Sequence, residues 1–156
     1  MMIRFLFAIW ALLLAACTAE DPTRMDTDVL MTFDSSAPVA ETMDRFEALV
    51  RAQGLTVFAR IDHAANAASA GLELPANQVL IFGNPKAGTQ LMQANPDVGL
   101  DLPLRALVRE KGDGSVLIMQ DPASVAVRYR IRTLKPLLAK IRSTLRTLGT
   151  DAVKAG

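Results

Sequence analysis

Two apolar, strand-like runs in the second half of the sequence are joined by only four residues, and this spacing constrains the fold more than any other feature. The runs are Leu104–Glu110 and Ser115–Gln120, and Lys111-Gly112-Asp113-Gly114 connects them. Glycine adopts the positive φ angles that tight hairpin turns need. The two strands must run antiparallel, because parallel neighbours need a crossover of about a dozen residues or more.

Three further strands are predicted before this hairpin, over residues 28–34, 55–62 and 78–82. Each shows the alternating or continuous apolar pattern of a strand, and in 55–62 the side chains of Val57, Ala59 and Ile61 are expected on one face. Amphipathic helices are predicted after Pro38, ending at Gly54, and over 133–148, ending at Gly149. Shorter helices are predicted over 63–70 and 89–94. This order indicates an α+β fold in two layers, an antiparallel sheet of about five strands with helices packed on one face.

The first sixteen residues predict a bacterial lipoprotein signal peptide. Arg4 precedes twelve apolar residues, fewer than the roughly 20 that span a bilayer. The run ends in Leu14-Ala15-Ala16-Cys17, which is typical of a lipoprotein cleavage site. Cys17, the only cysteine, is expected to carry the lipid, while an ordinary secretory signal or a short membrane anchor are the alternatives. Because Thr18 follows rather than aspartate, the expected location is the outer membrane, facing the periplasm.

The remaining chain is expected to form one domain. Residues 17–27 are polar and predict a tether, residues 28–150 the domain, and residues 151–156 a short tail. Residues 128–156 contain eight basic residues and one acidic residue. This pattern is typical of a solvated helix face, with an anionic lipid surface as the alternative. Nucleic acid is not an expected partner, because no aromatic and basic platform is present.

Four blocks in the second strand and beyond resemble a known family. They are Phe58–Ala65, Ala70–Pro75, Leu80–Thr89 and Asp101–Leu104. Together they are similar to the domain-of-unknown-function family 302 (DUF302), over about residues 28–130. The resemblance implies a fold like that of the TATA-binding protein, with the order β-α-β-β-β-β-α, and a homodimer. It implies no activity, because the family has no established one.

His63 is the only histidine and directly follows Asp62. A neighbouring carboxylate can orient an imidazole ring and raise its pKa, which suits a general acid or base. The alternative is a structural role, in which His63 bonds the loop or caps the helix that follows.

Residues 83–89, Gly-Asn-Pro-Lys-Ala-Gly-Thr, have some features of a phosphate-binding loop. A true phosphate loop places lysine directly before its Ser or Thr, where this chain has Gly88. Asn84, Lys86 and Thr89 are therefore predicted to hold at most a small anion at a helix N-terminus. A tight loop that needs glycine is the alternative.

No metal or cofactor is expected. One histidine and one cysteine cannot form a structural zinc site. Met92 and Met119 beside His63 could bind copper(I), but methionines are more often fillers of the core.

The function predicted from these observations is a lipid-anchored envelope protein that binds a small ligand or serves as an accessory module. Its candidate pocket combines Asp62, His63, the Asn84–Thr89 segment and Asp101, at the ends of strands. The alternatives are a small enzyme that uses His63, and a homodimeric structural protein at the membrane surface. The sequence identifies no reaction and favours a protein that is not an enzyme.

Overall fold

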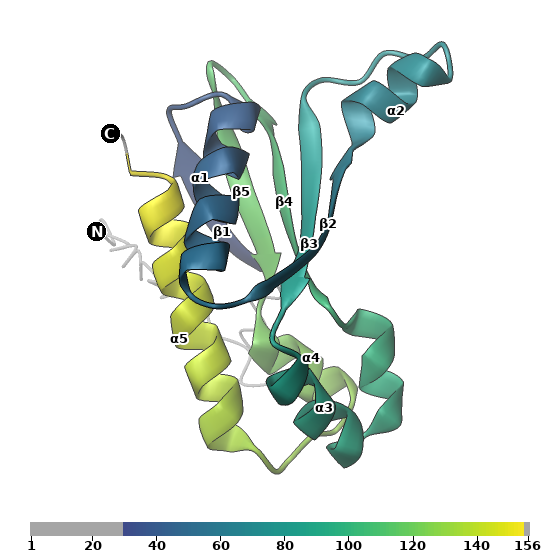
Figure 1. Ribbon diagram of the computed structural model, residues 1–156, viewed down its shortest axis with the longest axis vertical. Coiled ribbons are helices and arrows are strands. Elements are labelled where there is room, and N and C mark those ends of the chain that lie inside the picture. Colours follow the sequence, from purple (N-terminus) through teal and green to yellow (C-terminus); the bar gives the residue numbers. More distant parts are fainter. Residues whose placement is uncertain (1–29, 155–156) are drawn as a thin grey trace, which may run out of the picture.

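The computed structural model describes residues 30–154, which form one antiparallel sheet with helices on one face and at both ends (Figure 1). The strands are β1 (Leu30–Ser35), β2 (Thr56–Asp62), β3 (Asn77–Gly83), β4 (Leu104–Lys111) and β5 (Gly114–Gln120). The helices are α1 (Val39–Ala52), α2 (His63–Ser69), α3 (Pro85–Ala94), the short 3-10 helix η1 (Pro96–Asp101), α4 (Pro122–Arg128) and α5 (Lys135–Ala152). The predicted leader and tether lie outside the described residues.

The strand order is β1-β5-β4-β3-β2, and every neighbouring pair is antiparallel. The predicted α+β class and five-stranded antiparallel sheet are thereby confirmed. Gly112, in the predicted turn between β4 and β5, has φ +57°. In the described residues α1 and α5 cover one face of the sheet (Figure 1), as predicted for the two amphipathic helices. The shorter helices lie elsewhere, because α3, η1 and α4 gather at one end and α2 projects from the other (Figure 1).

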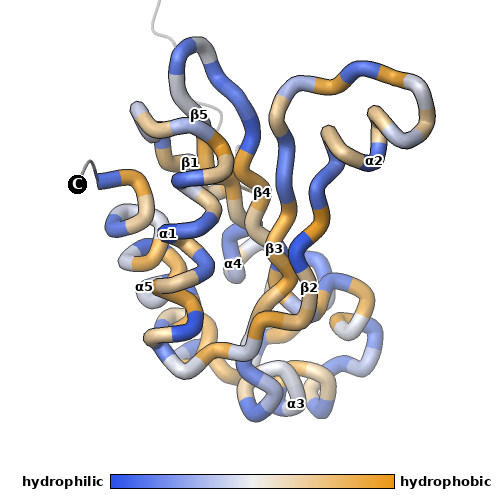
Figure 2. The backbone as a smooth tube through the Cα atoms, turned by 45° about the horizontal axis from the view of Figure 1, so that its top comes forward, coloured by the Kyte–Doolittle hydropathy of each residue, from blue (hydrophilic) through white to orange (hydrophobic). Residues whose placement is uncertain are grey.

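The core lies between the sheet and the pair α1 and α5. The rings of Phe46 on α1 and Phe82 on β3 meet edge to face, with centroids 5.4 Å apart. Both side chains are completely buried, as is Leu80 on β3. Figure 2 shows the continuous apolar stretch of β3 beside β4. β3 is half-buried or buried along its whole length. For this reason the 78–82 run does not alternate between apolar and polar residues.

The predicted alternation in β2 is wrong, because the pairing of β2 with β3 shifts at a bulge. Val57 pairs with Phe82, but Ala59 already pairs with Ile81, so Phe58 is the extra residue. A bulge places residues on opposite faces that strict alternation would put on the same face. Val57 consequently joins the core with Phe82, while Ala59 shares the other face with Ile81.

A cluster of three buried hydroxyl groups ties β1, α1 and β5 together. The Thr42 hydroxyl lies 2.9 Å from both the Ser35 and the Ser115 hydroxyl. Ser115 Oγ also donates to the carbonyl oxygen of Ala37 at 2.8 Å. Each buried hydroxyl therefore has a hydrogen-bond partner, as a stable interior requires.

The last helix continues past its predicted end. Gly149 does not end α5, which runs on to Ala152. Glycine is needed at this position for a packing reason, since a Cβ atom there would lie 2.5 Å from the Phe33 ring on β1. The close approach of α5 to β1 thus depends on a residue without a side chain.

Gly149→Ala is expected to destabilise the fold by about 1–3 kcal/mol, because overpacking a filled interior has that cost. The roughly 1 kcal/mol by which alanine favours a helix over glycine offsets part of this cost, so a net loss of up to about 2 kcal/mol is expected. Urea denaturation of the variant and of wild type measures the net change in the free energy of unfolding.

Gly88→Ala is the matched control, since Gly88 also lies inside a helix and its added Cβ would meet only Leu102 Cδ1, at 3.8 Å. This variant should be more stable than wild type by about 0.5–1 kcal/mol. Equal stability of Gly149→Ala and wild type would contradict the packing argument.

Candidate functional site

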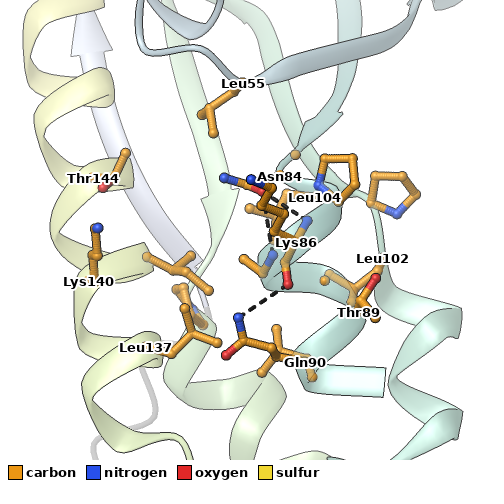
Figure 3. Close-up of a pocket in the computed structure, with 18 of the residues that line it drawn as sticks. Leu55, Asn84, Lys86, Thr89, Gln90, Leu102, Leu104, Leu137, Lys140 and Thr144 are labelled. Carbon is orange, nitrogen blue, oxygen red and sulfur yellow. Dashed lines mark hydrogen bonds between the residues drawn. The ribbon is translucent and has the colours of Figure 1, made fainter. Parts of the chain in front are cut away.

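A groove of about 670 Å³ opens where α3, α4 and α5 meet the ends of the strands (Figure 3). Its walls are mainly apolar, and Phe58 and Met92 within it are 52% and 39% exposed. Pockets of a few hundred Å³ with apolar walls are the usual places where proteins bind partners or small molecules. The larger apolar residues of the groove are Leu55, Phe58, Leu91, Met92, Leu102, Leu104, Leu137, Leu138, Ile141 and Leu145.

The charged residues that line the groove are both positive. Lys86 comes from α3 and Lys140 from α5, and Figure 3 shows Lys140 and Thr144 facing the α3 residues across the opening. Among the described residues no aspartate or glutamate lines it. Within the described part of the chain neither lysine forms an ion pair. The groove therefore suits an apolar occupant that carries negative charge.

The Asn84–Thr89 segment is the start of a helix rather than a loop. The predicted helix over 89–94 begins four residues earlier than expected, because Pro85 occupies its first turn and Asn84 caps it. Asn84 Oδ1 accepts from the backbone N–H of Lys86 at 3.0 Å and of Ala87 at 3.4 Å. The Gly88 N–H donates to the Asn84 carbonyl oxygen. An anion at this helix start would have to displace the asparagine cap.

Asp62 and His63 lie at the far end of β2 and β3 from the groove. Asp62 pairs with Gln78, whereas Gly83, next to Asn84, pairs with Thr56. Six residues of strand separate these ends by about 20 Å. His63 is exposed at the start of α2.

The Asp62 carboxylate holds the start of α2 in place. It accepts from the Ala65 N–H at 2.9 Å and from Gln78 Nε2 at 3.0 Å. These two hydrogen bonds, the backbone one first, lower the pKa of the Asp62 carboxyl below its usual value. Both oxygens are thus engaged by the helix cap and by β3, and neither has a hydrogen bond to His63 in the described structure.

Asp101 is buried and joins three elements without lining the groove. Its carboxylate accepts from Arg128 of α4 at 2.7 Å and from Arg105 of β4 at 3.4 Å. Burial raises the pKa of the neighbouring Tyr129, and a hydrogen bond to Asp101 adds to this shift. The Asp101 carboxylate is therefore interpreted as part of a structural ion pair rather than as a reactive group.

The structure therefore divides the predicted site residues among separate places. Asn84, Lys86 and Thr89 line the groove, while Asp62, His63 and Asp101 do not. Sequence reasoning missed the contribution of α5, including Leu137, Lys140 and Ile141. The sequence signal that could have indicated this contribution is the length of the apolar stripe of α5. The stripe is longer than the part of the helix that the sheet can cover.

The methionines weighed as copper ligands are also apart from the histidine. Met119 is 2% exposed in the core, and Met92 lies in the groove. In residues 30–154 no three His, Cys, Asp or Glu side chains form a group that could hold a metal ion. Across the same residues we find no helix with the length and apolar character needed to cross a membrane.

The family model described as "Domain of unknown function DUF302" matches residues 31–149. Among solved structures, an uncharacterized conserved DUF302 protein from Bacillus stearothermophilus has a TM-score of 0.73 with this chain. The match covers 81% of this chain and 99% of that one, at 22% sequence identity. At this identity the likeness establishes the fold alone.

Curated relatives carry a functional name. Proteins called fluoride-specific ion channel FluC 1 from Brucella suis and Brucella abortus are each 48% identical to this chain over 103 residues. The match covers 65% of this chain but 41% and 38% of those relatives. The chain thus spans about two fifths of the length of the curated relatives it matches.

These names overturn the function predicted from the sequence. Relatives named as fluoride channels conflict with a lipid-anchored ligand-binding module. That prediction is wrong, because the pattern of a leader and scattered polar residues contains no signal for fluoride. The lipid on Cys17 and the outer-membrane location stay predictions, since residues 1–29 lie outside the described part. The homodimer also stays a prediction.

Removal of the Asp62 carboxylate is expected to loosen α2 in a pH-dependent way. The pKa of Asp62 is lowered in the folded chain, so its stabilising effect is present above the unfolded value, near pH ~4, and is lost as pH falls through the lower folded value. In Asp62→Ala, hydrogen exchange at the Ala65 amide should be several-fold faster at neutral pH.

The same comparison below pH ~4 should show a shrinking difference between variant and wild type. Asp113→Ala, which removes an exposed carboxylate in the β4–β5 turn, is the control and should leave the Ala65 amide unchanged. Equal exchange in Asp62→Ala and wild type at neutral pH would show that the cap is not needed.

Proposed function

This chain belongs to the DUF302 family, and we propose that it serves in the cell's handling of fluoride, in association with a fluoride-specific ion channel. One observation carries the proposal: 48% identity over 103 residues to proteins with that name. The Bacillus stearothermophilus neighbour contributes nothing to it beyond the fold.

The proposal divides the work between two parts. The matched region is about two fifths of each relative, and in this chain it falls within an α+β protein. We assign fluoride conduction to the part of each relative that lies outside the match, about three fifths of its length. To this chain we assign the role that the matched part, about two fifths of the length, has in those relatives. In those relatives the two parts share one polypeptide, so a working association between them is a natural expectation.

We do not assign a fluoride site to α3. Its first backbone N–H groups are the conventional place for an anion at a helix start. Those of Lys86 and Ala87 are bonded to Asn84, whose cap an anion would need to replace. The chain is therefore expected to act on a channel through its surface rather than by holding the ion at this point.

Deletion of the gene for this chain is expected to lower tolerance to sodium fluoride several-fold, measured as the concentration that halves growth. Sodium chloride at equal concentrations is the control for salt stress and should not separate the strains. The wild-type chain should restore tolerance. Phe46→Ala, which removes a completely buried ring of the core, should not.

An unchanged fluoride tolerance in the deletion strain would contradict the proposed function. So would a growth defect of equal size in chloride, because it would reflect general fragility rather than fluoride.

A further inference from the structure

We propose that the groove is filled by a projecting segment from a second copy of this chain, so that two copies exchange these segments. The segment, called the arm here, comprises residues 63–76 between β2 and β3, and Leu72-Glu73-Leu74 is the part that would enter the groove. This inference concerns how the site is completed and does not depend on the role in fluoride handling.

The arm is an ordered feature that leaves apolar side chains in solvent. None of its residues is buried, and Leu72 and Leu74 are 66% and 43% exposed. Hydrogen bonds within the arm fix its shape, including one from the Leu72 N–H to the Ala67 carbonyl oxygen at 2.9 Å. Gly71, with φ +74°, ends α2 in the left-handed conformation that glycine permits. A segment shaped in advance loses little conformational entropy when it binds.

The arm and the groove are complementary in polarity and charge. Glu73 stands between the two exposed leucines, and the arm contains no lysine or arginine. The groove has apolar walls and two lysines, Lys86 and Lys140, and within residues 30–154 no acidic residue lines it. In the described structure Glu73, like both lysines, forms no ion pair within the chain. Binding would therefore bring leucines onto the apolar walls and one carboxylate to a lysine.

The geometry requires that the arm come from another copy. The arm leaves the sheet where Asp62 pairs with Gln78, and the groove lies beyond the opposite end, where Thr56 pairs with Gly83. These ends are about 20 Å apart, and α2 points away from α3 (Figure 1).

The strand between the arm and the groove, β2, is an edge of the sheet. A second copy laid beside β2 in the reverse direction would place each arm over the other copy's groove. This is a closed two-fold arrangement, the commonest symmetry of oligomers.

Sedimentation equilibrium of the purified chain tests the proposal through charge reversal. Wild type is expected to be a dimer, and Glu73→Lys should raise its dissociation constant about tenfold or more, because it brings a third positive charge into the groove. Glu110→Lys makes the same change at an exposed position in β4 and should leave the dimer intact. Combining Glu73→Lys with Lys86→Glu or Lys140→Glu should restore dimerisation with at least one of the two lysines.

Disulfide trapping gives an independent reading of the same contact. In a Cys17→Ser background, Leu72→Cys mixed with Met92→Cys is expected to form a disulfide between copies. Leu72→Cys mixed with Leu30→Cys should not, because Leu30 is exposed on β1, at the other edge of the sheet. A monomeric wild type would overturn the proposal. So would a dimer that Glu73→Lys leaves unchanged, or one in which the Leu72 and Met92 cysteines fail to join.

Discussion

The antiparallel pairing of β2 with β3 is the constraint on which the rest of this structure depends. Its register places Asp62 beside Gln78 at one end and Thr56 beside Gly83 at the other. The chain between the strands must therefore extend from the first end, where it forms α2. The chain after β3 must leave from the second end, where it forms α3. One pairing thus separates the exposed arm from the groove by the full length of a strand.

The groove exists because the helices continue beyond the sheet. Asn84 and Pro85 start α3 directly after β3, and α5 is long enough to cover both the sheet and this end of the molecule. Leu91, Val98 and Val125 form a second small core there, separate from the main one. The Asp101 carboxylate, held between Arg105 and Arg128, joins η1 to β4 and α4 beside it. The second core and these ion pairs therefore hold the residues around the groove in place. A fixed surface of this kind suits association with another protein chain.

The sequence predicted the fold better than the site, and particular residues explain the difference. Strand and helix patterns depend on local periodicity, so the short β4–β5 connection and the stripe of α5 were enough to predict the sheet and its long helix. The bulge at Phe58 and the role of Gly149 depend on residues distant in sequence, Ile81 and Phe33, and no local pattern reports them. Asn84, Lys86 and Thr89 were found because they cluster in sequence. Lys140 was missed because only the packing of α5 brings it to the same groove.

The rate at which fluoride leaves the cell tests the central claim most directly. Cells loaded with fluoride and moved to fluoride-free medium can be followed with a fluoride-selective electrode, with channel abundance matched between strains. If the chain works with a fluoride channel, its removal should slow the release, and restoring it should return the rate to that of wild type. An identical release rate with and without the chain, at equal channel abundance, would contradict the account.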